Sequence, residues 1–304
     1  MRIASIDVGT NTILLLIVNV HPSGVFDVLH DEQVIARLGK GVDKQRMIST
    51  ETMERVGKFI AAYKETCNNF AVDKIIASGT SALRDAKNRS EFCSFIERKT
   101  GISIEVVSGD DEAFWTYRGA ISEFLDRSDN YSVIDIGGGS TEIITGDRTT
   151  IHSNVSIDIG SVRITERFFK SSPPGAYAIE EARNFIRSHI MSLRLDPVSS
   201  SYSIGVAGTV TTLAAIDQKL VEYDRKKVSG YLLTYKNIQS IFTMLKEMSN
   251  AEIQSIPQIS PGRSDIILAG ILILLEYMDI ARLQTITVCD RGLRYGLVLK
   301  EIGK

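Results

Sequence analysis

Three glycine-rich turns in this sequence are suited to hold phosphate groups. They begin at Asp7 (DVGTNT), at Asp135 (DIGGGST) and at Gly205 (GVAGTVTT). Glycine lets backbone N–H groups approach a ligand closely, and consecutive N–H groups form a nest for phosphate oxygens. The third turn also opens a predicted helix, whose N-terminus favours anions. The phosphate-binding candidates are Gly9, Thr10, Asn11, Thr12, Gly137, Gly138, Gly139, Ser140, Thr141, Gly208 and Thr209.

Carboxylates accompany two of these turns. Asp7 and Asp135 each end a predicted strand just before a turn, and Glu142 starts the return strand after the second one. Mg²⁺ is usually held by one or two carboxylates together with water and substrate phosphates. We therefore expect Asp7, Asp135 and Glu142 to hold Mg²⁺ or another divalent cation. A single such turn would also fit a plain hairpin, but three together favour phosphate chemistry.

The sequence offers no covalent nucleophile with a partner base. It lacks the GxxxxGK[ST] loop of P-loop enzymes and the GxSxG elbow of serine hydrolases. The pair His30-Asp31 resembles part of a metal phosphohydrolase motif, but His21, His152 and His189 are not spaced to complete it. These patterns favour attack by water, with a carboxylate as the general base.

The elements that must position these residues come in two copies. Strand–turn–strand patterns at 3–20 and 132–144 share an Ile-Asp-x-Gly core, and Asp135 follows Asp7 by 128 positions. That spacing is too long for a solenoid repeat and fits two copies of one domain. Helices alternate with strands between the copies, which predicts an α/β protein. Helices are expected at 50–70, 90–100, 110–124, 178–195, 236–248 and 265–280, and strands at 74–77, 102–107, 202–206 and 285–288.

Composition indicates a globular protein without a nucleic-acid or membrane partner. The 304 residues are 43% hydrophobic, and the net charge of -2 argues against a dedicated nucleic-acid binder. The most apolar stretch, 266–275, is too short to span a bilayer and predicts a core helix. Three dispersed cysteines and an N-terminus unlike a signal peptide suit the cytoplasm. A polyanion would have to use local basic clusters, at 37–46, 84–89 and 225–227, which would otherwise be solvated surface.

Six sequence motifs resemble those of the exopolyphosphatase/guanosine pentaphosphatase family. They are IDVGTNTILLLIV from Ile6, SGTSALRDAKN from Ser78, SGDDEAFWTYRGA from Ser108, IDIGGGSTEI from Ile134, GVAGTVTTLA from Gly205 and CDRGLRYGLV from Cys289. They follow the family's order over almost the whole chain. The glycine turns are shared with the wider actin-like superfamily, which includes sugar and acetate kinases, whereas the second and third motifs are more specific.

The resemblance implies two duplicated actin-like (ribonuclease H-like) domains with the site in the cleft between them. We expect domain I at 1–126, domain II at 127–290, and the C-terminal segment 291–304 packed back on domain I. Glu112 matches the catalytic glutamate that deprotonates water, and Arg84 matches an arginine that meets the phosphate chain. Asp135 and Glu142 match carboxylates that position the metal or water. The chain resembles the short, two-domain form.

These features predict a phosphohydrolase. The expected reaction is metal-assisted release of terminal phosphate from inorganic polyphosphate, or conversion of guanosine pentaphosphate to tetraphosphate. The sequence does not choose between the two substrates, and it leaves the oligomeric state open, a homodimer included. The alternatives are an ATP-dependent kinase of the actin-like superfamily and a non-catalytic sensor of guanosine alarmones. The kinase alternative does not explain the SGDDEA motif. The sensor alternative does not explain why Glu112, Asp135 and Glu142 are all present, because a protein without turnover does not need them.

Overall fold

The chain folds into two compact units, each built around its own β-sheet. The computed structural model describes residues 1–193 and 202–303. Unit 1 comprises Met1–Gly119 and the stretch from Leu293 onward, and unit 2 comprises Ala120–Gly292. The chain thus leaves unit 1 after Gly119 and returns to it at Leu293, where the sequence had suggested borders at 126/127 and 290/291.

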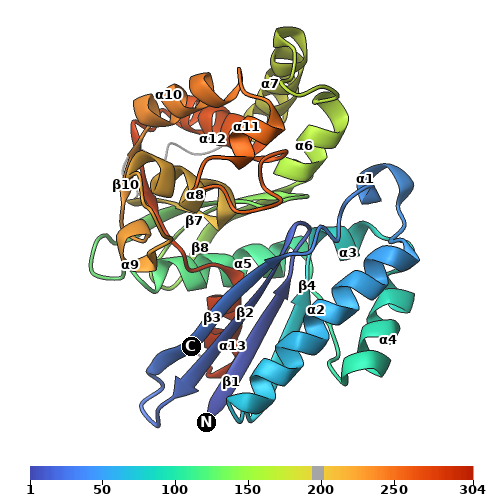
Figure 1. Cartoon of the computed structure of the whole chain (residues 1–304). Coiled ribbons are helices and arrows are strands. Elements are labelled where there is room, and N and C mark those ends of the chain that lie inside the picture. The colour runs from blue at the N-terminus through green and yellow to red at the C-terminus, as the bar shows by residue number, and fades with distance from the viewer. Residues whose placement is uncertain (194–201, 304) are drawn as a thin grey trace. The chain divides into compact units, whose positions relative to one another are not determined.

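Unit 1 contains a five-stranded sheet with strand order β3-β2-β1-β4-β5 (Figure 1). The first three strands are antiparallel, whereas β4 runs parallel to β1 and β5 parallel to β4. The carboxyl ends of β1, β4 and β5 therefore meet at one edge. The strands are β1 (Arg2–Val8), β2 (Thr12–Val20), β3 (Phe26–Ile35), β4 (Lys74–Gly79) and β5 (Glu105–Val106).

Helices cover both faces of this sheet, because alternate residues of its central strands point to opposite sides. Ala4 and Ile6 of β1 pack in the core cluster that includes α2 and α4, while Ile3 packs with Tyr295 and Val298 of α13. Figure 1 shows α2 and α4 on one face and α13 on the other. The helices are α1 (Val42–Gln45), α2 (Thr50–Asn69), α3 (Ser81–Asp85), α4 (Arg89–Thr100), α5 (Gly109–Ile121) and α13 (Leu293–Glu301).

Unit 2 repeats the same topology. Its strand order is β10-β11-β9-β6-β7-β8, so β6, β7, β8, β9 and β11 take the places of β1, β2, β3, β4 and β5. The two Ile-Asp-x-Gly turns join equivalent strands, β1 to β2 and β6 to β7. This equivalence confirms the predicted duplication. The strands are β6 (Asn130–Ile136), β7 (Thr141–Asp147), β8 (Ile151–Ile157), β9 (Tyr202–Val206), β10 (Leu232–Thr234) and β11 (Thr285–Val288).

One helix, α12, lies at the centre of the larger core. Its residues from Ile267 to Met278 are all buried, as the apolar run at 266–275 predicts. No helix in the described ranges 1–193 and 202–303 is long and apolar enough to cross a membrane. The helices of unit 2 are α6 (Ser161–Phe168), α7 (Ala176–Ser192), α8 (Ala207–Asp217), α9 (Arg225–Val228), α10 (Tyr235–Leu245), α11 (Asn250–Gln254) and α12 (Ile267–Ile280). The expected helix at 178–195 corresponds to α7, and its last two positions lie outside the described residues.

Candidate active site

The first glycine turn joins β1 to β2 in unit 1. The N–H of Gly9 donates to the carbonyl oxygen of Thr12 at 3.1 Å, which closes the turn. A Cβ atom at Gly9 would lie 2.8 Å from that oxygen, so the tight turn requires glycine. The carbonyl groups of Thr10 and Asn11 point away, where they accept from the N–H groups of Gly39 and Arg37. The turn is therefore fixed from behind by the loop that follows β3.

Donor groups on this turn are left available for a ligand. Thr10 and Asn11 are each only 7% exposed, yet the Asn11 Nδ2 group is buried without an acceptor among the described residues. A buried polar donor without a partner costs about 1–3 kcal/mol. An anion at the turn would remove that cost. Asp7 and Thr12 flank the turn on β1 and β2, so the structure gathers all five predicted residues, Gly9 included, at one strand end.

Arg84 and Glu112 form an ion pair in unit 1. Arg84 lies on α3, directly after β4, and its guanidinium donates to the Glu112 carboxylate and to the carbonyl oxygen of Val107. Glu112 lies in the first turn of α5, where Ser108 accepts a hydrogen bond from the N–H of Asp111. Because Asp7 pairs with Ser78 in the parallel ladder, β1 and β4 end together. Arg84 and the first glycine turn thus follow neighbouring strand ends.

The environment of Glu112 favours a basic carboxylate. Burial raises its pKa above the ordinary glutamate value, and the positive charge of Arg84 offsets part of that rise. A carboxylate with a raised pKa accepts a proton from water more readily, provided that it is ionised at the working pH. Arg84 therefore favours the charged form of Glu112, while burial raises the pKa of its carboxyl group.

The second glycine turn joins β6 to β7 in unit 2. The carbonyl oxygens of Gly137 and Gly138 accept from the first N–H groups of α6, at 2.8–3.2 Å, and Arg163 Nε donates to Gly139 at 2.8 Å. With these carbonyl groups bound on one side, no acceptor in the described chain meets the N–H groups of Gly138, Gly139 and Ser140. Three consecutive amide donors are therefore available to an anion, and phosphate binding at this turn stays a prediction.

Close packing behind this turn depends on Gly160. A Cβ atom there would lie 2.4 Å from the backbone of Gly138 and 2.5 Å from the amide nitrogen of Gly139. Only a residue without a side chain lets the start of α6 approach the turn. Thr141, the last predicted residue of the turn, donates through its hydroxyl to the carbonyl oxygen of Ile159 at 2.6 Å, which fixes the same junction.

Asp135 and Glu142 face each other across the hairpin of the second turn. They are direct partners in the β6–β7 ladder, and Glu142 also accepts a hydrogen bond from Ser156 Oγ at 2.7 Å. Like charges opposite each other on paired strands repel, and a cation between them would relieve that repulsion. Two carboxylates also match the usual protein share of an Mg²⁺ shell. Within either unit, the described residues contain no group of three or more metal-ligating side chains. The third predicted ligand, Asp7, belongs to unit 1.

The third turn opens α8 and reveals a residue that the sequence did not suggest. Asp135 pairs with Val206, so this turn follows the strand end next to the second one. Thr209 packs against Gly270, and Gly208 lies so close to Arg263 that an added Cβ would overlap its guanidinium. Burial lowers the pKa of Arg263 below the usual arginine value, yet arginine stays charged. Arg263 follows Pro261-Gly262 in a loop, where no motif or spacing marks it.

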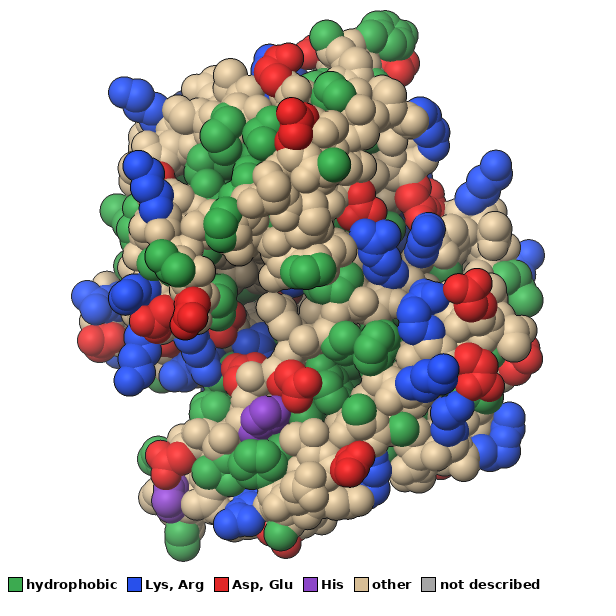
Figure 2. Space-filling model, in the orientation of Figure 1, with side chains coloured by type: hydrophobic (Ala, Val, Ile, Leu, Met, Phe, Trp, Pro, Cys, Tyr) green, Lys and Arg blue, Asp and Glu red, His purple; other side chains and the backbone are tan. Residues whose placement is uncertain are grey.

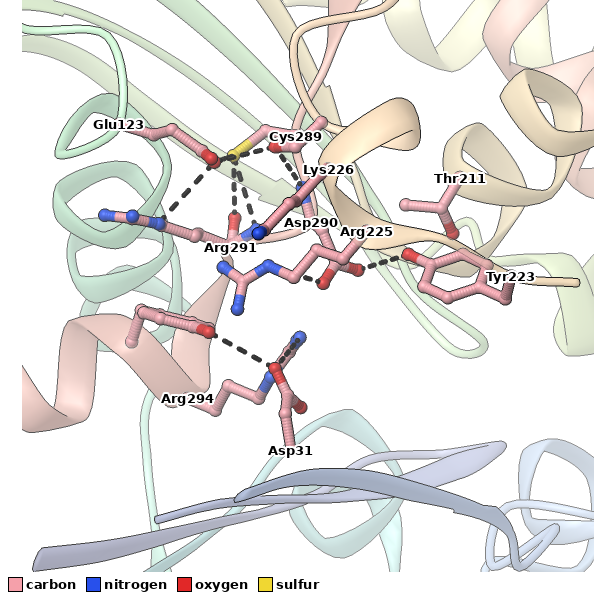
Figure 3. A network of polar contacts seen from close by, with 12 residues as sticks. Asp31, Glu123, Thr211, Tyr223, Arg225, Lys226, Cys289, Asp290, Arg291 and Arg294 are labelled. Atoms are coloured by element: carbon pink, nitrogen blue, oxygen red, sulfur yellow. Dashed lines mark hydrogen bonds and ion pairs between the residues drawn. The ribbon is translucent and has the colours of Figure 1, made fainter. Parts of the chain in front are cut away.

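The motif that begins at Cys289 plays a structural part in unit 2. Cys289 Sγ lies 3.4 Å from Glu123 Oε2, and Arg291 pairs with the same carboxylate at 3.5 Å (Figure 3). Asp290 accepts from Tyr223 at 2.7 Å and pairs with Arg225 at 3.2 Å. Burial raises the pKa of the Cys289 thiol well above its usual value, so this cysteine is protonated and no nucleophile.

Comparison with known proteins identifies the family. The sequence profile of the Ppx/GppA phosphatase family matches residues 16–304. This chain belongs to that family. Exopolyphosphatase 2 of Mycobacterium tuberculosis is 32% identical over 316 residues, which cover 99% of each chain. A bifunctional 3-dehydroquinate synthase/phosphatase of Fusobacterium nucleatum is 33% identical over 309 residues, 98% of this chain but 46% of that protein.

Solved structures of the Ppx/GppA family share the fold. An Aquifex aeolicus family member is 32% identical, with a TM-score of 0.83 over 99% of this chain and 97% of that one. An exopolyphosphatase of Cytophaga hutchinsonii is 26% identical, with a TM-score of 0.89 over 100% of this chain and 98% of that one. The predicted family is confirmed, and so is the predicted α/β fold with two domains of duplicated topology.

Proposed function

We propose that this Ppx/GppA family member releases the terminal phosphate of inorganic polyphosphate, of guanosine pentaphosphate, or of both. The observation that carries the proposal is the ion pair of Arg84 with the buried Glu112 at the strand ends of unit 1. It combines a proton acceptor with a cation suited to phosphate. The exopolyphosphatases of similar sequence support polyphosphate as a substrate.

The residues of this chain divide the work of hydrolysis. Glu112 accepts the proton of the attacking water on a carboxylate oxygen as the new P–O bond forms. The bond between the terminal phosphorus and the bridging oxygen breaks, and the shortened chain leaves with that oxygen and its electron pair. Arg84 pairs with oxygens of the phosphate chain through its planar guanidinium. Asn11 Nδ2 in unit 1 and the amide groups of the second glycine turn in unit 2 are each suited to bind phosphate oxygens. Most of the rate acceleration in phosphoryl transfer comes from such positioning and charge stabilisation.

The proposal includes a divalent cation, most simply Mg²⁺, held in unit 2 by Asp135 and Glu142. When bound, the cation neutralises negative charge on the transferred phosphoryl group. The donor set is entirely oxygen, which suits Mg²⁺ rather than softer metals.

A side-by-side assay tests the proposal. Phosphate release is measured from long-chain polyphosphate, tripolyphosphate and guanosine pentaphosphate, each with Mg²⁺ and then with EDTA. We expect release from at least one substrate in Mg²⁺ and a loss of activity in EDTA. ADP formation from ATP with a sugar or carboxylate panel would indicate the kinase instead. Tight binding of guanosine pentaphosphate without any turnover would indicate the sensor.

We also propose that the protein acts in the cytoplasm. Its three cysteines are free, and two of them are buried. Reducing conditions preserve such thiols.

A further inference from the structure

Two basic stretches of unit 1 form one continuous surface, which we name the basic strap and define as residues 37–46 and 84–89. The N–H of Lys87 donates to the carbonyl oxygen of Arg46 at 2.8 Å, and the Arg46 guanidinium pairs with Asp85 at 2.9 Å. Beside them, the Asn88 side chain forms two hydrogen bonds of 2.9 Å with the backbone of Ile48. Stretches distant in sequence are therefore held side by side.

The first residue of each stretch of the basic strap lies next to a part of the candidate active site. Its first residues, Arg37 and Gly39, donate their N–H groups to the carbonyl oxygens of Asn11 and Thr10, at 2.8 and 2.7 Å. Its second stretch begins with Arg84, the partner of Glu112. Any anion bound at the turn or at Arg84 therefore lies at an end of the strap.

The strap carries a local excess of positive charge. It contains seven basic residues against two acidic ones, in a chain whose net charge is -2. Lys40, Lys44 and Lys87 are exposed, and none of them pairs with a carboxylate of the described residues. Figure 2 shows basic side chains on the face of unit 1 that carries α1. A cluster of positive side chains without paired carboxylates attracts a polyanion and raises its local concentration.

The composition of the strap favours a condensed phosphate over a nucleic acid. Neither stretch, 37–46 or 84–89, contains Phe, Tyr, Trp or His. Binding of single-stranded nucleic acid relies on aromatic side chains on which the bases stack. A chain of condensed phosphate carries charge on every unit and has no base to stack.

We propose that the basic strap binds internal phosphates of a polyphosphate chain whose terminal phosphate lies at the Thr10–Asn11 turn. This inference rests on the proposed function of the same site. A terminal phosphate uses the turn and Arg84, whereas the phosphates that follow it meet Lys40, Lys44 and Lys87. Affinity should therefore rise with chain length until the strap is covered.

The test compares a strap variant with a matched control. The strap variant is Lys40→Gln/Lys44→Gln/Lys87→Gln. The control removes three lysines elsewhere, Lys64→Gln/Lys219→Gln/Lys236→Gln, none of which pairs with a carboxylate of the described chain. Both variants lose the same charge, and thermal unfolding confirms that both fold. KM and kcat are measured for tripolyphosphate and for long-chain polyphosphate at several salt concentrations.

We expect the strap variant to raise the KM for the long chain about tenfold, since it loses three exposed ion pairs that each strengthen binding by roughly a factor of two. The KM for tripolyphosphate should change much less. The slope of log affinity against log salt should fall by about 2, at about 0.7 per contact as for single-stranded polyanions. The control variant should show neither change.

The inference would be overturned if the strap variant kept the chain-length dependence of the parent, or if the control variant showed an equal rise in KM. It would also be overturned if the parent bound single-stranded RNA more tightly than polyphosphate and the strap variant lost that binding. Absence of turnover on any phosphate chain would instead contradict the proposed function. The strap is then tested by equilibrium binding of labelled long-chain polyphosphate to the same variants, which needs no catalysis.

Discussion

The substitution Glu112→Gln tests the general base most directly. Glutamine has the same shape as glutamate, so it can still accept a hydrogen bond from Arg84, which donates to this side chain in the parent. It cannot accept a proton from water at neutral pH. The variant should therefore keep its fold and bind substrate while losing turnover.

The expected loss follows from the role of the carboxylate. A positioned general base contributes about 10²–10⁴-fold in rate. That range corresponds to about 3–5 kcal/mol of barrier, at 1.36 kcal/mol for each factor of ten. The cost in stability should be smaller. Removing one partner of a buried ion pair costs about 3–5 kcal/mol. Here the amide keeps the hydrogen bond and the Arg84 side chain is 22% exposed to water, so we expect about 1–2 kcal/mol.

The pH profile separates a base from a structural residue. Burial raises the pKa of Glu112, so the parent loses its ionised base as the pH falls through that raised value. Its kcat/KM should therefore fall on the acid side, with a midpoint above the ordinary glutamate pKa. The glutamine variant has no group to ionise at this position, so that limb should disappear.

The assay is phosphate release over a range of pH, with Glu97→Gln on the exposed side of α4 as the control. The control should match the parent in rate and in pH dependence. Turnover of the Glu112→Gln variant within a few-fold of the parent would refute the role of Glu112. So would an acid limb that persists in that variant.

Three further predictions concern other parts of the site. Asp135→Ala should raise the Mg²⁺ concentration needed for half-maximal activity at least tenfold, and full activity after exhaustive chelation would contradict the metal proposal. Arg84→Gln should move the acid limb of kcat/KM to higher pH, because it removes the positive charge that offsets part of the rise in the pKa of Glu112. A limb at lower pH would contradict this effect of Arg84. Gly160→Ala should destabilise unit 2 by about 1–3 kcal/mol in denaturant unfolding, since its Cβ would meet the backbone of Gly138 at 2.4 Å. Gly175→Ala, which meets nothing within 4 Å, is its control.

The sequence by itself determined the two hairpins and most of the helices. Alternating apolar residues on either side of a glycine turn are a local signal, and both Ile-Asp-x-Gly cores lie where two strands join. The helix expected at 50–70 is α2, which Ser49 caps by accepting from the N–H of Thr52. Such signals involve residues that are close together in the chain, so they can be recognised in the sequence without the tertiary structure.

The third strand of each sheet escaped prediction. Most residues of β3 are exposed or half-buried, so no apolar run or strict alternation marks it. It forms a strand because its backbone pairs with β2, which is a property of the assembled sheet. The same reason applies to β8, whose partner is β7.

The site shows the same division. Residue types near the turns indicated phosphate and metal chemistry, and resemblance to a family suggested Arg84 and Glu112. Only the tertiary structure joined Arg84 to Glu112, set Gly160 against the second turn and placed Arg263 beside Gly208. These contacts link residues far apart in the chain, and their geometry depends on how whole elements pack. The burial that raises the pKa of Glu112 likewise exists only once α3, α5 and the sheet have come together, because isolated segments leave that carboxylate in water.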